Sequence, residues 1–192
     1  MDQTVPAIIV MGVAGCGKTS VAQAVAARLG GRFIEGDAFH PVANVEKMRR
    51  GIGLVDADRW GWLDRLAAEL NDARERGEPA VLACSALKRR YRERLRLGNP
   101  SARFIFLELP QTEAAKRVGQ RNGHFMPDSL VASQFADLEA PLSETLTLTV
   151  DATRPLDAIV DQALDWHTGV ALGRRSFAIE RDSAISTSTL SA

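Results

Sequence analysis

The chain has 192 residues, of which 45% are hydrophobic and 25% charged, and its 24 acidic residues balance its 24 basic ones. This length suits one domain with a single sizeable core, and the composition is ordinary for a globular protein. The balanced charge argues against nucleic acid or a membrane as partner, and no apolar run approaches the roughly 20 residues of a membrane helix. Because Met1–Thr4 also lacks the basic start of a signal peptide, we expect a cytoplasmic protein.

Apolar runs and helical patterns alternate along the chain. Strands are predicted at about 7–11, 32–35, 80–84, 103–109 and 146–150. Helices are predicted at about 18–29, 42–50, 57–76, 88–96, 112–121, 128–138 and 156–167. Short apolar strands that alternate with helices indicate a doubly wound α/β fold, in which a parallel sheet binds ligands at the carboxyl ends of its strands. We therefore expect the functional residues directly after the strands.

The first predicted strand is followed by the phosphate-loop motif G-x-x-x-x-G-K-S/T and then by a helical pattern. Glycines let the backbone N–H groups wrap around a polyphosphate, and the start of the helix adds partial positive charge. Lys18 is expected to reach the outer phosphates of ATP and to act in catalysis, and the Thr19 hydroxyl is expected to bind Mg²⁺. The predicted nucleotide-binding residues here are Gly12, Val13, Ala14, Gly15, Cys16, Gly17, Lys18, Thr19 and Ser20.

Two carboxylates end the second predicted strand, whereas the third strand ends without one. Glu35 and Asp37 are two residues apart, so both point to one face of an extended chain. A small-molecule kinase needs a carboxylate beside the reacting hydroxyl and another that supports the metal. We assign the first role to Asp37 and the second to Glu35. The alternative for Asp37 is that it only caps a turn after Gly36.

Cationic and hydrogen-bonding side chains follow the second and third strands. His40 comes shortly after Asp37, and the next predicted helix carries Lys47. Lys88 and Arg92 belong to a basic cluster at the start of the helix after the third strand. Such donors suit a polar, anionic substrate with many hydroxyl groups. The alternatives are a solvated loop histidine and, for the basic cluster, an exposed helix face.

Two arginines, Arg117 and Arg121, lie four residues apart before a segment with glycine and proline, 122–127. This pattern favours a mobile lid, at about 117–141, whose arginines close on the nucleotide. The alternative is a surface helix with an exposed turn. We expect one kinase domain over 1–167 and a C-terminal extension, 168–192, that is disordered at its serine- and threonine-rich end.

The two cysteines, Cys16 and Cys84, are too few for a disulfide framework, so both are expected to be reduced thiols.

With these residues in view, the chain resembles the gluconokinases of the P-loop type, which are relatives of shikimate and adenylate kinases. The resemblance covers about residues 7–167 and rests on the phosphate loop together with several further blocks. These blocks are Gly36-Asp37-Ala38-Phe39-His40-Pro41, Asn44-x-x-Lys47-Met48, Asp56-x-Asp58-Arg59-Trp60-x-Trp62-Leu63, Cys84-Ser85-Ala86-Leu87-Lys88-Arg89-x-Tyr91-Arg92, Gly123-His124-Phe125-Met126-Pro127 and Ser133-Gln134-Phe135-x-x-Leu138-Glu139-x-Pro141. Gly53 and Gly61 stand where the family often has proline, which loosens these positions without removing a polar group.

The resemblance implies a three-layer P-loop kinase fold, with strand order 2-3-1-4-5, helices on both faces of the sheet and a mobile lid. It implies transfer of the γ-phosphate of ATP to the 6-hydroxyl of D-gluconate, with Mg²⁺, commonly in a homodimer. Arg117 and Arg121 resemble the R-x-x-x-R pair of adenylate kinases, of which one arginine stacks on adenine and the other meets phosphate; we place Arg121 among the catalytic residues. The implied gluconate-binding residues are Asp37, His40, Lys47, Arg59, Lys88, Arg92 and His124.

Two other functions stay open. One is a kinase for another small hydroxy acid, such as shikimate, which would share the phosphate loop but need a different pocket. The other is a nucleotide-binding regulatory module without catalysis, against which the joint presence of Lys18, Thr19 and Asp37 argues. A GTP-binding switch is disfavoured because the sequence has no N-K-x-D element.

Overall fold

The computed structural model describes residues 6–120 and 128–171. Its sheet is parallel and consists of β1 (Ile8–Met11), β2 (Arg32–Glu35), β3 (Ala80–Ala83), β4 (Arg103–Glu108) and β5 (Thr147–Asp151). The strand order is β2-β3-β1-β4-β5, which confirms the predicted topology. Each strand lies within two residues of its predicted bounds, because a short apolar run between a turn and a helix leaves little freedom in where it starts and ends.

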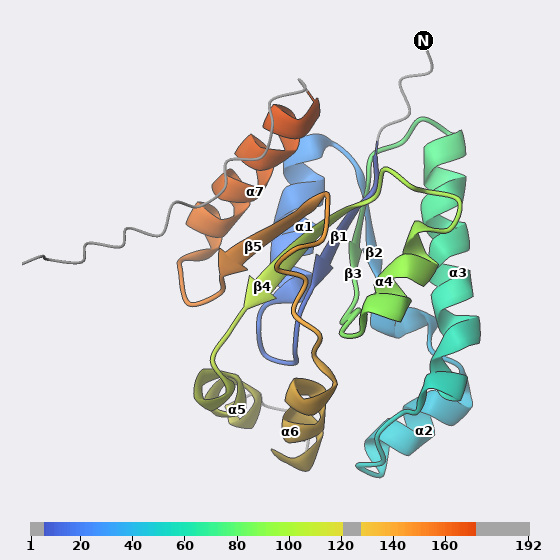
Figure 1. Ribbon diagram of the computed structural model, residues 1–192, viewed down its shortest axis with the longest axis vertical. Helices are drawn as coiled ribbons and strands as arrows, with labels where there is room; N and C mark the ends of the chain where they lie inside the picture. Colours follow the sequence, from blue (N-terminus) through green and yellow to red (C-terminus); the bar gives the residue numbers. More distant parts are fainter. Residues whose placement is uncertain (1–5, 121–127, 172–192) are drawn as a thin grey trace, which may run out of the picture.

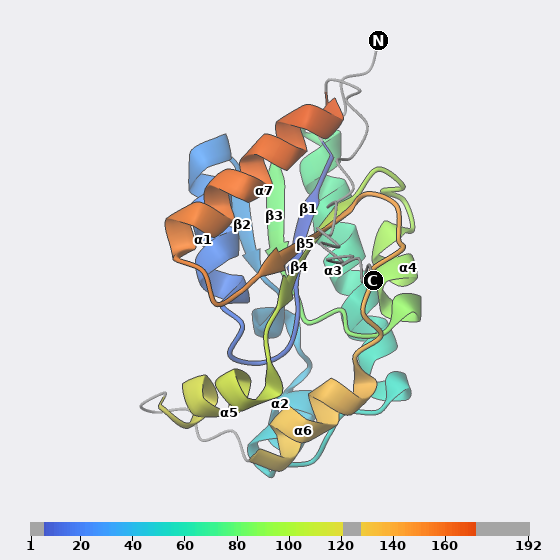
Figure 2. The same ribbon diagram turned by 60° about the vertical axis from the view of Figure 1, so that its left-hand side comes forward.

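Helices cover both faces of this sheet and its carboxyl edge. Their bounds are α1 (Lys18–Leu29), α2 (Val42–Arg49), α3 (Asp56–Glu75), α4 (Arg89–Arg96), α5 (Gln111–Gly119), α6 (Asp128–Asp137) and α7 (Leu156–Ala171). Figure 1 shows α1 and α7 on one face and α3 and α4 on the other, while α2, α5 and α6 lie beyond the strand ends. Figure 2 shows the same arrangement of α5 and α6 from a second direction. The three predicted layers are therefore present.

The core is divided by the sheet into two clusters. Alternate residues of β1 point to opposite faces, so that Ile8 packs toward α1 and α7 while Ile9 packs toward α3 and α4. Trp62 of α3 fills the second cluster and is 2% exposed. Both faces of β1 are thus apolar, as a strand in the middle of a parallel sheet requires.

A short 3₁₀ helix, Gly36–Phe39, follows β2 directly and was not predicted from the sequence. A side chain at Gly36 could not be accommodated, because a Cβ atom there would lie 2.4 Å from the carbonyl oxygen of Ala83. The carbonyl oxygen of Gly36 accepts a hydrogen bond of 2.8 Å from the indole of Trp62. The turn that carries Asp37 is therefore held between β3 and α3.

None of the helices in the described ranges is long and apolar enough to cross a membrane.

Helix α7 packs on the sheet through an unusual polar contact at its end. The buried Arg103 donates hydrogen bonds from Nη1 to the carbonyl oxygen and the ring Nδ1 of His167, the latter at 2.9 Å. An Nδ1 that accepts a hydrogen bond must be unprotonated. Burial lowers the pKa of His167 to about 4, and the positive charge of Arg103 acts in the same direction.

This contact makes stability depend on pH. The unfolded chain binds the His167 proton near pH 6.5 and the folded chain near pH 4, so this contribution is complete above pH 6.5 and is lost as the pH falls toward 4. We expect the free energy of unfolding of the wild type to decrease between about pH 7 and about pH 5 by more than that of His167→Gln, which keeps an acceptor but does not titrate. Urea unfolding of both proteins at the two pH values measures this difference, and equal decreases would contradict it.

Candidate active site

The phosphate loop connects β1 to α1 in the conformation that its glycines allow. Gly12 has φ +140° and Gly17, at the start of α1, has φ +94°, both in the region that favours glycine. A Cβ atom at Gly12 would lie 2.8 Å from the carbonyl oxygen of Leu107, so the loop passes directly over β4. Lys18 donates a hydrogen bond of 3.0 Å to the carbonyl oxygen of Val13 within the loop. The side chain of Lys18 therefore turns back toward the phosphate loop, and its ammonium group binds the loop backbone.

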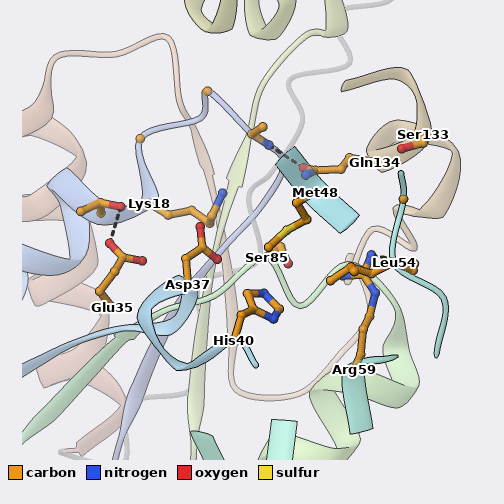
Figure 3. A pocket seen from close by; sticks show the side chains of 15 residues that line it. Lys18, Glu35, Asp37, His40, Met48, Leu54, Arg59, Ser85, Ser133 and Gln134 are labelled. Atoms are coloured by element: carbon orange, nitrogen blue, oxygen red, sulfur yellow. Dashed lines mark hydrogen bonds between the residues drawn. The ribbon is translucent and has the colours of Figure 1, made fainter. Parts of the chain in front are cut away.

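A cavity of about 150 Å³ opens beside this loop. It is bounded by the phosphate loop, the end of β2, the start of α3 and helix α6, and Figure 3 shows its side chains. The predicted site residues that line it are Ala14, Gly15, Gly17, Lys18, Thr19, Glu35, Asp37, His40 and Arg59. The structure thus brings the predicted phosphate, metal and hydroxyl-activating groups into one cavity.

Further lining residues had no predicted role, namely Met48, Gly53, Leu54, Ser85, Ser133 and Gln134. Several of them belong to the blocks that carry the family resemblance, so their presence in those blocks was the available signal.

Thr19 and Glu35 form a pair of oxygen donors at one end of the cavity. The Thr19 hydroxyl donates a hydrogen bond of 2.8 Å to Oε2 of Glu35. Hydroxyl and carboxylate oxygens suit Mg²⁺, which in phosphate-loop sites takes its other ligands from substrate phosphates and water. No group of three or more His, Cys, Asp or Glu side chains suited to a metal occurs among the described residues. The Thr19 and Glu35 oxygens are thus of the kind that Mg²⁺ prefers.

Asp37 and His40 face the cavity from the turn after β2. In Figure 3 the carboxylate of Asp37 points toward the ammonium group of Lys18. The His40 ring stacks on Trp62 with centroids 4.1 Å apart and an interplanar angle of 16°. Burial lowers the pKa of His40, although the nearby charge of Asp37 acts in the opposite direction. Burial thus favours the neutral imidazole, which can donate one hydrogen bond and accept another.

Arg59 supplies the cationic group of the cavity wall that α3 forms. Its Nη2 donates to the carbonyl oxygen of Leu54 at 3.2 Å, and its guanidinium lies 5.5 Å from the ring centroid of Tyr91. Its Nε is buried and has no hydrogen-bond partner within the described ranges. A buried donor without a partner is costly, so this atom is suited to a ligand.

Two predicted lysines are engaged in ion pairs outside the cavity lining. Lys47 lies 2.6 Å from Oδ1 of Asp58, and Lys88 lies 3.3 Å from Asp56 and 2.9 Å from Asp137. The positive charge of Lys88 is therefore balanced by the carboxylates of Asp56 and Asp137.

Arg92 is also placed differently from the prediction. It is 1% exposed, and its guanidinium is bound by the Glu144 carboxylate and by the carbonyl oxygens of Ala86, Leu87 and Glu139. The burial of Glu144 acts to raise its pKa, but hydrogen bonds and charges from Arg92 and Arg96 together outweigh this and lower it. Arg92 thus joins α4 to the segment after α6, and the structure does not bring it to the cavity.

The predicted lid is described only at its two ends. Arg117 donates to Glu113 at 3.0 Å and to the carbonyl oxygen of Ala152 at 3.0 Å, beside the loop after β5. Arg121 and His124 lie outside the described residues. The lid at about 117–141 and the nucleotide-binding roles of Arg117 and Arg121 remain predictions.

Both cysteines are free, as predicted, and both are buried. Burial raises the pKa of the Cys16 thiol inside the phosphate loop, and it raises the pKa of the Cys84 thiol to about 12.

A parallel sheet in this order, with a phosphate loop after its first strand and a carboxylate facing the loop lysine after its second, makes this chain a P-loop kinase. A family model described as an AAA domain matches residues 8–145. A gluconokinase of Gluconobacter oxydans (strain 621H) is 45% identical over 157 residues, which is 82% of this chain and 88% of that protein. The chain therefore belongs to the gluconokinase family.

Solved structures agree with this assignment. The crystal structure of a gluconokinase from Sinorhizobium meliloti 1021 has a TM-score of 0.81 and 44% identity, and the match covers 88% of this chain and 95% of that one. A shikimate kinase from Bacteroides thetaiotaomicron has a TM-score of 0.58 at 17% identity, with 83% and 97% coverage. The shikimate kinase shares the fold alone.

The buried Arg92–Glu144 pair leads to a prediction about stability. Glu144→Gln leaves a buried guanidinium without its counter-charge, so we expect a loss of about 3 kcal/mol in the free energy of unfolding. The exposed pair Arg94–Asp64 is the matched control, and Asp64→Asn should cost less than about 1 kcal/mol. Urea unfolding measures both. Similar losses of unfolding free energy in the two variants would mean that the Glu144 charge is not required to stabilise the buried guanidinium of Arg92.

Proposed function

We propose that this protein phosphorylates D-gluconate at its 6-hydroxyl with ATP and releases 6-phospho-D-gluconate and ADP. The observation that carries the proposal is the single cavity in which Lys18 and Asp37 face each other and His40 and Arg59 form the adjoining wall. The family membership of the chain supports the choice of gluconate. Gluconate has one carboxylate and several hydroxyl groups, which suits a wall that combines a neutral imidazole with a guanidinium.

In the proposed reaction the 6-hydroxyl oxygen attacks the γ-phosphorus of ATP, and the bond from that phosphorus to the β,γ-bridging oxygen breaks. The hydroxyl proton passes to the carboxylate of Asp37, and the bridging oxygen leaves as part of ADP. Lys18 moves from the Val13 carbonyl to the phosphates and stabilises the negative charge on the transferred group.

Magnesium is part of this proposal. When bound with ATP it neutralises phosphate charge, and Thr19 and Glu35 would hold it through their hydroxyl and carboxylate oxygens. Glu35 therefore supports the nucleotide side of the cavity while Asp37 serves the acceptor side.

The outer residues of the predicted site have supporting roles in the proposal. Lys47 and Lys88 would reach gluconate only by exchanging their present carboxylate partners. Arg117, Arg121 and His124 are proposed to contact nucleotide or substrate from the lid. A homodimer in the cytoplasm completes the proposal, with gluconate and ATP as its small-molecule ligands.

The first test is an ADP-release assay with purified protein over a panel of aldonic acids and shikimate. We expect gluconate to give the highest kcat/KM, because the family resemblance includes the blocks that line the acceptor side of the cavity. Shikimate is expected to give at most a trace of turnover. A preference for shikimate or for another acid would contradict the assignment of gluconate as substrate but not the kinase fold.

The second test concerns Asp37. Asp37→Asn keeps the size of the side chain and removes the proton acceptor, so kcat should fall about 100-fold with a small change in KM. This value lies at the low end for a general base, because a loose phosphoryl transition state needs little proton removal. Asp157→Asn, an exposed position at the start of α7, is the control and should match the wild type. A defect in KM alone would contradict the role of Asp37.

A further inference from the structure

Gln134 connects helix α6 with the phosphate loop. The backbone N–H of Ala14 donates a hydrogen bond of 2.7 Å to Oε1 of Gln134, across 120 positions in the sequence. Gln134 also lines the cavity that contains Lys18 and Asp37. Its side chain is thus in contact with the loop on one side and with the cavity on the other.

The hydrogen bond from Ala14 determines the orientation of the Gln134 carboxamide. An N–H group requires an acceptor, and the oxygen is the only acceptor of a carboxamide, so Oε1 lies on Ala14. The Nε2 group, with its two N–H donors, is then on the side of the carboxamide that does not contact Ala14. Figure 3 shows Gln134 extending from α6 toward the phosphate loop, to the right of the side chains of Lys18 and Asp37.

The base of α6 is held firmly, which makes the position of Gln134 reproducible. Asp137 lies 2.9 Å from Lys88 at the last turn of the helix. Just beyond it, the N–H of Glu139 donates to the carbonyl oxygen of Leu87 at 3.0 Å, and its carboxylate accepts from the N–H of Arg89 at 2.6 Å. A helix that is attached at its base and at Gln134 presents the carboxamide in a preorganised position.

The chemistry of the cavity identifies what this amide group faces. Under the proposed function, the terminal phosphate lies between Lys18 and Asp37, because the lysine binds it and the hydroxyl activated by Asp37 attacks it. Helix α6 forms another wall of the same cavity, through Ser133 and Gln134. A terminal phosphate has oxygens that point away from both the lysine and the attacking hydroxyl, and these need donors on that wall.

We propose that Gln134 is a ligand of the terminal phosphate of ATP, which its Nε2 group binds while its Oε1 holds Ala14. This inference rests on the proposed function for the place of the phosphate. Gln134 distinguishes the triphosphate from the diphosphate, because ADP has no phosphate at that position.

The experiment compares two nucleotides and needs no acceptor substrate. Affinities for Mg²⁺ with ADP, and for Mg²⁺ with the β,γ-imido analogue of ATP, are measured by calorimetry on the full chain. In Gln134→Leu, which keeps the side-chain volume, we expect the analogue to bind about ten-fold more weakly, the size of a lost hydrogen bond to a charged group. The affinity for ADP should change by less than about two-fold. Gln23→Leu, an exposed position on α1, is the control and should change neither affinity.

A second variant guards against a general effect of removing the side chain. Gln134→Glu can still accept from Ala14, but it replaces the donor by negative charge, so it should weaken the analogue more than Gln134→Leu does. Equal losses for ADP and the analogue in both variants would show that Gln134 only shapes the loop, and wild-type affinity for the analogue would remove it from the site. Either result overturns the inference.

The wild type, tested in the same series, separates this inference from the proposed function. If it fails to phosphorylate gluconate, the proposed substrate is wrong, while the ratio of the two nucleotide affinities still decides whether Gln134 binds the terminal phosphate.

Discussion

One buried guanidinium connects the segments that form the α6 side of the active site. Arg92 binds the carbonyl oxygens of Ala86 and Leu87 after β3, the carbonyl oxygen of Glu139 after α6 and the carboxylate of Glu144. A buried charge is tolerated only when its hydrogen bonds are satisfied, so these segments must meet at this point. The place of α6, and with it that of Gln134 beside the phosphate loop, depends on this junction.

The acceptor side of the cavity depends on α3 in a comparable way. Trp62 donates to the carbonyl oxygen of Gly36 and stacks on the ring of His40, so one indole fixes both ends of the turn that carries Asp37. The nucleotide side is built separately, from β1, the phosphate loop and α1. The two sides meet where Lys18 faces Asp37, and the hydrogen bond from Thr19 to Glu35 joins them at the end of β2.

The sequence predicts those parts of the molecule that local pattern determines. The strand order followed from the family resemblance, and the strand and helix bounds followed from short apolar runs and helical spacing. A basic run at a strand end is typical of an anion-binding site, and it predicts that role for Lys88 and Arg92. Their partners Asp56, Asp137 and Glu144 lie far away in the sequence, so that no local pattern indicated them. For Gln134 the only signal in the sequence is its place in one of the blocks that carry the family resemblance, which does not indicate its contact with Ala14, 120 positions away.

The cysteine within the phosphate loop, Cys16, is kept from reagents by the packing around it. Oxidants and alkylating agents react with the thiolate form of cysteine. Cys16 is buried with a raised pKa, and the thiol of Cys84 has a pKa of about 12, so both are protonated and shielded at neutral pH. Neither thiol is therefore an exposed nucleophile in this fold, although Cys16 belongs to the phosphate loop itself.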